Sequence, residues 1–287
     1  METFELRYFL AVARHQNIHT AAKQNSVSPG ALSKAVSRLE LELGVKLFTR
    51  LGRNIGLTEH GRVLQTRAAE IIRLEEAAKL EIQGKIGRLN IIFAGPEIVL
   101  GNIGFDIAMG LRKRHPNSSF EFLSAHDEDA VAMVSHGTAH LAISTLSPSS
   151  QLTSKTVKKC VFQTIVGPKH PLYSEALNGK TVAVEKLLEH PFVCPSRGFL
   201  GRIQNEQSSD GWRDDVFARR IEYVTSSLKL IESIVSSGQG LAYLPNYLVE
   251  KMDALPLKVS GCPYSCHQEI KLIAKNPEAA SWMKRLF

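Results

Sequence analysis

Residues 21–53 read AAKQNSVSPGALSKAVSRLELELGVKLFTRLGR, and they predict two short helices joined by a polar turn and followed by a basic hairpin. Ala21-Ala22 is small enough for close contact between helices, and Val27-Ser28-Pro29 supplies the turn. On the second helix, apolar residues recur at helical spacing, at Leu32, Val36 and Leu39. This order of features is typical of a winged helix-turn-helix.

The other face of the second helix is polar and cationic, and such a face can enter the major groove of B-DNA and donate to base edges and phosphates. Ser28 can cap this helix, and Pro29 lies in its first turn, where a missing N–H costs nothing. Strands expected at 47–50 and 55–58 would form a wing whose arginines lie beside the duplex backbone. The candidate DNA-binding residues are Ser28, Pro29, Gly30, Ser33, Lys34, Ser37, Arg38, Arg50 and Arg53.

Basic residues are concentrated at the N-terminal end of the chain. The 287 residues carry a net charge of +7, and eight Lys or Arg against four Glu give residues 1–58 a net charge of +4. A cationic end on a nearly neutral body matches a polyanion-binding unit, whereas charge alone would also fit a solvated basic surface. The acidic start and the arginines at 7 and 14 do not form a signal peptide, so we expect a cytoplasmic protein that does not enter a membrane.

A long helix is predicted from Thr58, a suitable N-cap, to about Gln83, because this region has no proline. Apolar residues recur along it near heptad spacing, at Leu64, Ala68, Ile71, Ala78 and Ile82. At ~1.5 Å per residue the helix would be on the order of 40 Å long, and its apolar stripe needs a covering surface. A second copy of the same helix is the expected cover, which predicts a homodimer or a homotetramer. Packing within one chain is the alternative.

The order of features over residues 3–62 resembles the LysR-type transcriptional regulators. The residues that carry this resemblance are Leu6, Phe9, Ala21-Ala22, Ser33, Leu39-Glu40, Leu43-Gly44, Leu47-Phe48-Thr49-Arg50 and Leu57-Thr58-Glu59-His60-Gly61. The resemblance implies an α/β protein with an N-terminal winged helix-turn-helix, a long linker helix and a C-terminal periplasmic-binding-protein-like (type 2) effector domain of two α/β subdomains. It also implies double-stranded DNA and a small-molecule effector as partners.

The implied boundaries are a winged helix-turn-helix at 1–58, a linker and dimerisation helix with a hinge at 59–88, and an effector domain at 89–287. Subdomain I would take 89–164 and 267–287, and subdomain II 165–266. Strand-like runs at 89–94, 119–124, 141–144, 161–166, 181–184 and 191–194 alternate with helical ones, which predicts a largely parallel sheet. The resemblance continues at 137–143, 170–172 and 238–245, with His140 in place of the family's acidic residue.

Effectors of such domains lie in the cleft between the subdomains, where strand ends and helix N-termini meet. Glu97 in the cleft would disfavour anionic effectors, whereas Arg197 would favour them, and Glu97 as a helix cap would be structural. Loop structure and helix capping are the alternative roles of any single Ser or Thr. The segments expected to converge there are Gly95-Pro96-Glu97, Ser144-Thr145, Pro195-Ser196-Arg197 and Thr225-Ser226.

An α/β enzyme with an appended DNA-binding domain is one alternative function. An enzyme needs a nucleophile, a base or a metal cage, and the chain has no GxSxG, HExxH, P-loop or GxGxxG pattern. Its ten histidines are scattered. We therefore expect no catalytic residue, no cofactor and no bound metal.

A cysteine-based redox sensor is the other alternative. Cys262 and Cys266, with His267 adjacent, are spaced as in a zinc or redox motif but lack a fourth ligand, so reduced thiols are expected. Cys160 and Cys194 lie in apolar, strand-like runs, where buried thiols are inert. In the peroxide-sensing branch of the family two reactive cysteines follow the strand at 191–194 within a few residues, and this chain has no cysteine between 194 and 262.

Overall fold

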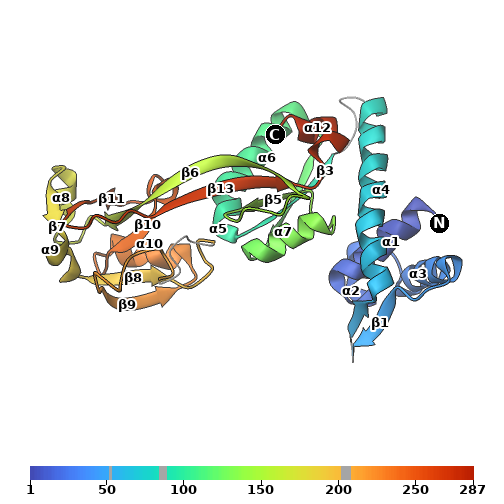
Figure 1. The fold of residues 1–287 in the computed structure, drawn as a ribbon, viewed down its shortest axis with the longest axis horizontal. Coiled ribbons are helices and arrows are strands. Elements are labelled where there is room, and N and C mark those ends of the chain that lie inside the picture. The colour runs from blue at the N-terminus through green and yellow to red at the C-terminus, as the bar shows by residue number, and fades with distance from the viewer. Residues whose placement is uncertain (52–53, 84–88, 202–207) are drawn as a thin grey trace.

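The computed structural model describes residues 1–51, 54–83, 89–201 and 208–287. A small helical unit at the N-terminal end is followed by one long helix, which stands beside an elongated two-lobed α/β body (Figure 1). Among the described residues, no helix combines the length and the apolar character that crossing a membrane requires.

The winged-helix unit consists of α1 (Thr3–His15), α2 (Ile18–Gln24), α3 (Pro29–Leu43), β1 (Phe48–Leu51) and β2 (Asn54–Leu57). The two strands are antiparallel, with Phe48 opposite Leu57. Removal of apolar side chains from water stabilises the unit, because the three helices and the wing bury two neighbouring apolar clusters. Their most buried members are Leu6, Phe9, Val12, Ala21, Leu32, Leu39 and Leu47. The prediction of a winged helix-turn-helix is confirmed.

The linker helix α4 (Glu59–Gln83) is continuous over 25 residues. The expected cap is present, because the Thr58 hydroxyl accepts a hydrogen bond from the Gly61 amide at 3.0 Å and donates to the Lys46 carbonyl at 2.6 Å. The interpretation of its whole apolar stripe as a dimer surface is wrong, because α1 lies along α4 as far as Glu76. Leu64, Ala68 and Ile71 pack there in the core of the winged-helix unit.

Other apolar side chains of α4 remain uncovered within the chain. Val63 is 62% exposed, Leu74 57% and Ile82 85%, in contrast to Ala68, which is fully buried. The stripe is therefore divided between an intrachain face and an exposed face. The hinge expected at 84–88 lies outside the described residues.

One seven-stranded sheet runs through both lobes of the body in the order β10-β6-β13-β5-β3-β4, with β11 also paired to β6. Its strands are β3 (Asn90–Gly95), β4 (Ser119–Ser124), β5 (Leu141–Ser144), β6 (Thr153–Val166), β10 (Ala242–Pro245), β11 (Leu255–Pro256) and β13 (His267–Ala274). Within this sheet, as far as the structure describes it, only β3, β4 and β5 pair in parallel, so the prediction of a largely parallel sheet is wrong. The long antiparallel strands β6 and β13 join the lobes (Figure 1).

Lobe I is the part of the body next to α4. Besides β3, β4 and β5 it contains α5 (Glu97–Val99), a π-helical turn (Leu100–Gly104), α6 (Phe105–Arg114), α7 (Asp127–Ser135), a 3₁₀ turn (Pro277–Ala279) and α12 (Ser281–Lys284). The π-helical turn joins α5 directly to α6.

Lobe II is the distal part of the body. It contains two further pairs of parallel strands, β8 with β9 and β7 with β12. The bounds are α8 (Tyr173–Leu177), β7 (Thr181–Ala183), α9 (Val184–Leu188), β8 (Pro191–Pro195), β9 (Arg220–Thr225), α10 (Leu228–Ser236), α11 (Asn246–Val249) and β12 (Lys258–Ser260). Because β3, β4 and β8 end where the lobes meet, the loops that follow these strands surround the junction.

Candidate DNA interface and effector cavity

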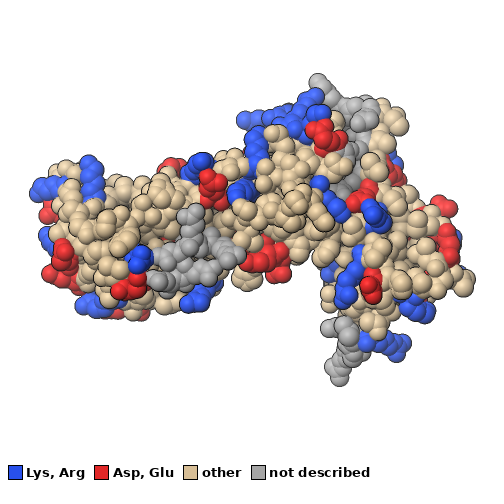
Figure 2. Space-filling model, viewed as in Figure 1, with Lys and Arg blue, Asp and Glu red and all other residues tan. Residues whose placement is uncertain are grey.

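The front of α3 is an exposed polar surface on the outer end of the winged-helix unit. Leu32 and Leu39 on the back of the helix are fully buried, whereas Ser33, Lys34 and Ser37 are exposed. Figure 2 shows separate Lys and Arg side chains on the visible face of this unit, interspersed with acidic ones. A helix that is anchored by one face and presents hydroxyl and ammonium donors on the other fits a major groove.

The start of α3 is fixed by the predicted cap. The Ser28 hydroxyl accepts a hydrogen bond from the Ala31 amide at 3.1 Å, and Pro29 is the first helical residue. Ser28 and Gly30 are exposed, and nothing lies within 4 Å of a methyl group placed on Gly30. A DNA backbone can therefore approach this end of the helix closely.

Glu40 joins α3 to the wing. Its carboxylate accepts hydrogen bonds from Lys46 Nζ at 2.6 Å and from the Leu47 amide at 2.9 Å, with Phe48 at 3.4 Å. Burial opposes ionisation of Glu40, but these donors outweigh it and lower its pKa. Glu40 belongs to the motif that carried the family resemblance, and the structure gives it a positioning role between helix and wing.

The arginines predicted to contact DNA are placed differently from one another. Arg50 is exposed at the end of β1, as a backbone contact requires. Arg38 is 60% exposed, but its Nε lies 2.9 Å from the buried carboxylate of Glu5, so part of its guanidinium is engaged within the unit. Arg53 lies outside the described residues.

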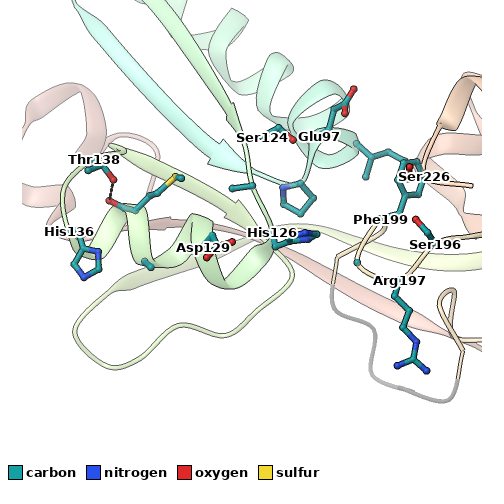
Figure 3. A pocket seen from close by; sticks show the side chains of 16 residues that line it. Glu97, Ser124, His126, Asp129, His136, Thr138, Ser196, Arg197, Phe199 and Ser226 are labelled. Atoms are coloured by element: carbon teal, nitrogen blue, oxygen red, sulfur yellow. Dashed lines mark hydrogen bonds between the residues drawn. The ribbon is translucent and has the colours of Figure 1, made fainter. Parts of the chain in front are cut away.

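A cavity of about 740 Å³ lies where the lobes meet. Loops after β3, β4 and β8 line it together with one side of α7 and with Ser226 (Figure 3). This volume is in the range of small-molecule sites. Two carboxylates, of Glu97 and Asp129, border it, and the side chain of Arg197 extends away from the other labelled residues in Figure 3.

The cavity brings together half of the predicted effector residues. Those that line it are Pro96, Glu97, Ser196, Arg197 and Ser226. Those that do not line it are Gly95, Ser144, Thr145, Pro195 and Thr225. Gly95 and Pro195 are buried strand ends, and the Thr225 hydroxyl accepts a hydrogen bond from the Ser227 amide at 3.1 Å. Thr225 therefore has the alternative role that we considered for any single Ser or Thr, which is to stabilise the local loop.

Ser144 and Thr145 are engaged by Asp127, which the sequence did not single out. The Ser144 hydroxyl donates to Asp127 Oδ1 at 2.5 Å, and Thr145 donates from its amide at 2.9 Å and from its hydroxyl at 2.8 Å. Asp127 is 3% exposed, so these donors satisfy a buried charge. Gly201, at φ +78°, approaches the same carboxylate, and a methyl group there would lie 2.7 Å from Asp127 Oδ2.

Phe199 and His126 are cavity residues that sequence reasoning missed. Phe199 comes from the loop after β8 and His126 from the loop after β4, so they face each other across the junction of the lobes (Figure 3). Gly198, at φ +78°, lies close to the His126 ring, where a methyl group would be 3.2 Å from Nδ1. For Phe199, an aromatic residue three positions after the predicted site residue Ser196 was the signal available in the sequence.

All four cysteines are free thiols, and three of them are buried: Cys160, Cys194 and Cys266. Burial raises the pKa of Cys160 to about 11, and it raises the pKa values of Cys194 and Cys266 to about 12. Thiolates are the reactive form, so these three side chains are unreactive near neutral pH. Among the described residues, no three His, Cys, Asp or Glu side chains form a group able to hold a metal ion.

The geometry defines a class of protein, a DNA-binding winged helix joined by a long helix to a two-lobed domain with a small-molecule cavity. Residues 4–62 match the family model of bacterial regulatory helix-turn-helix proteins of the lysR family, and residues 95–275 match that of the LysR substrate binding domain. The chain therefore belongs to the LysR family. It is a transcriptional regulator with a DNA-binding and an effector-binding domain, and it is not an enzyme.

Individual relatives extend over most of the chain. The transcriptional dual regulator GltC of Bacillus subtilis is 28% identical over 251 residues, which cover 85% of this chain and 81% of GltC. A full-length OxyR variant from Pseudomonas aeruginosa has a similar fold, with a TM-score of 0.69 at 19% identity over 100% of this chain and 92% of that one. CbnR in complex with its target DNA gives a TM-score of 0.53 at 19% identity, over 99% and 97% of the two chains.

Proposed function

We propose that the regulator reads its operator with the front of α3 and holds the duplex backbone with the wing. The exposed donors Ser33, Lys34 and Ser37 on a helix whose back is fully buried carry this proposal. At the start of the helix Pro29 and Gly30 would lie against the duplex, and Arg38, Arg50 and Arg53 would contact phosphates. The units implied are 1–58 for DNA binding, 59–88 for the linker and 89–287 for effector binding, in a cytoplasmic protein.

Genomic footprinting of the bound sites supplies the operator. Quantitative binding at fixed salt then compares the operator with a scrambled duplex, because base contacts change only the former. Ser33→Ala is expected to weaken operator binding and to leave binding to the scrambled duplex unchanged. Equal losses on both duplexes would show that Ser33 touches only the backbone.

The cavity between the lobes is the proposed effector site. Five of the predicted residues converge there with Phe199 and His126, and the described lining contains no assembled nucleophile, base and oxyanion donors. Two carboxylates, of Glu97 and Asp129, line the cavity with one guanidinium, of Arg197, which extends away from the other labelled residues in Figure 3, so the effector we propose carries no net negative charge.

A thermal-shift screen tests this site, with panels of amine-bearing, neutral and carboxylate metabolites. A hit from the first two panels should lose its shift in Phe199→Ala and Ser226→Ala and retain it in Ser233→Ala, a matched change on the exposed side of α10. Hits confined to carboxylates would refute the charge argument. Turnover of a hit, seen by product analysis, would contradict the sensor function.

We also propose that a second copy of α4 covers its exposed apolar side chains and makes the protein a dimer. The exposure of Leu74, which is 57%, supports this dimer contact. Ile71 does not support it, because Ile71 already packs within the chain. Leu74→Glu should shift the sedimentation of the protein toward monomer, whereas Arg62→Glu, also exposed on α4, should not. A Leu74→Glu dimer as tight as the wild type would place the contact elsewhere.

A further inference from the structure

The winged-helix unit and lobe I of the same chain are joined by two ion pairs. Arg14 of α1 donates two hydrogen bonds to the Glu121 carboxylate on β4, one of them at 3.2 Å. Glu70 of α4 forms a 2.9 Å pair with Lys275, which follows β13. One pair links the winged-helix unit to lobe I, and the other links the linker helix to it. Together they restrict how the winged-helix unit is oriented relative to the body.

A third contact brings the linker helix and lobe I tightly together at one point. Gly137, in the turn after α7, has φ +76°, and a methyl group placed on it would overlap the Ala69 methyl group of α4. Ala69 is 3% exposed, so the two backbones approach each other closely at this point. Any side chain at position 137 would have to push α4 away from the body.

The same turn is the wall between two cavities. Met133, His136 and Thr138 line the effector cavity at the far end of α7 (Figure 3). Gly137, Thr138 and His140 line a second cavity of about 380 Å³ between the winged-helix unit, α4 and lobe I. The Thr138 hydroxyl donates to the Met133 carbonyl at 3.1 Å, so the turn is tied to α7.

The end of the turn is anchored to the sheet. The Ile92 amide donates to His140 Nδ1 at 3.0 Å, and the His140 amide donates to the Ile92 carbonyl at 2.9 Å. The turn is held at one end by β3 and touches Ala69 of α4 at Gly137, so a displacement of α7 moves the point where the turn meets the linker helix. Packed interfaces of this kind change between discrete arrangements.

We propose that the turn at 136–140 couples occupancy of the effector cavity to the orientation of the winged-helix unit, through its contact with Ala69 and against the restraint of the two ion pairs. This proposal rests on the effector role proposed for the cavity. The contact leaves Ser33, Lys34 and Ser37 exposed, so it does not block DNA. It fixes the orientation of the unit in advance, and its loss makes operator binding weaker.

Gly137→Ala tests the coupling in the full-length protein without any effector. The matched control is Gly179→Ala, because Gly179 has a similar φ of +65° but a methyl group there would meet only Lys258 Nζ, at 3.8 Å. Gly137→Ala should weaken binding to the footprinted operator duplex at least fivefold and speed amide hydrogen exchange in α4 around residue 69. If both variants behave alike in binding and in exchange, the turn is not the coupling element.

The ion pairs give a second test that does not depend on the folding of a glycine variant. Glu121→Arg should reproduce the weaker operator binding, and Arg14→Glu together with Glu121→Arg should restore it to within twofold. Glu269→Arg, on an exposed carboxylate within the body, is the control. Absence of rescue in the reversed pair would overturn the role given to this contact.

Failure of the coupling can be told apart from failure of the proposed function. If Ser33→Ala weakens operator binding while Gly137→Ala and Glu121→Arg do not, the coupling is wrong and the DNA interface stands. If a thermal-shift hit loses its effect on operator affinity in Gly137→Ala but still binds, the coupling is supported directly. Undiminished regulation by that hit in the same variant would contradict it.

Discussion

Replacing Arg219 should destabilise lobe II more than any surface change. Arg219 and Asp210 are both fully buried as side chains, with Nη1 2.7 Å from Asp210 Oδ2 and Nη2 3.1 Å from Oδ1. Asp214 accepts two further hydrogen bonds from the same guanidinium, at 2.8 and 2.7 Å. The pair holds the connection between β8 and β9, which carries Ser196 and Phe199 into the effector cavity.

Arg219→Met leaves the Asp210 carboxylate buried without its cation. Removal of one partner from a buried pair typically costs about 3–5 kcal/mol, because the remaining charge keeps its desolvation penalty. Asp214 is 28% exposed and can recover water, so most of the loss should come from Asp210. Arg219→Met with Asp210→Leu removes both charges and should cost less than the single change.

Urea denaturation followed by tryptophan fluorescence measures this loss. The Trp212 ring lies 5.2 Å from the Arg219 guanidinium, and Trp282→Phe in every variant leaves Trp212 as the reporter. A loss below about 1 kcal/mol in Arg219→Met would refute the reasoning. A double variant as unstable as the single one would show that packing, and not the stranded carboxylate, sets the cost.

Three further outcomes follow from buried titratable groups. Glu40→Gln should destabilise the winged-helix unit by about 2 kcal/mol at pH 7, and since the folded pKa of Glu40 lies below 4.5, the difference from wild type should vanish as pH falls below that value. Burial, with His190 nearby, lowers the pKa of His170 to about 4. The free energy of unfolding should therefore decline as the pH falls from 6.5 to 4, because the unfolded chain binds a proton that the folded protein does not. In His170→Gln this decline should be smaller. Iodoacetamide at neutral pH should label Cys262 and reach the other thiols only after unfolding; ready labelling of Cys194 in the folded protein would revive the redox alternative.

The DNA-binding part could be predicted from sequence because its signals are local. Helical periodicity, the Ser28 cap and Pro29 are all set by residues within a few positions of each other. The same periodicity could not show which surface covers α4. Ala68 packs against α1, and that contact depends on the tertiary arrangement of segments about 60 residues apart in the sequence. A stripe of apolar residues predicts burial without naming the covering surface.

The effector cavity could be predicted only in part, for a related reason. Strand ends indicated which loops meet, and Ser196 and Ser226 do line the cavity. Asp127 accepts the hydrogen bonds of Ser144 and Thr145, and no local pattern shows that a carboxylate 17 or 18 residues away will do so. The antiparallel pairing of β13 was likewise hidden, because His267–Ala274 pairs with strands more than 100 residues distant in the chain.

The central claim, that α3 reads DNA bases with its exposed front, is tested most directly by Lys34→Ala. Affinities of wild type, Lys34→Ala and Lys229→Ala for operator and scrambled duplexes are measured by fluorescence anisotropy at one salt concentration. Lys229, 86% exposed in lobe II, is the matched control. Lys34→Ala should lose about 1–3 kcal/mol on the operator while Lys229→Ala loses nothing. An operator affinity of Lys34→Ala equal to that of wild type would contradict the account.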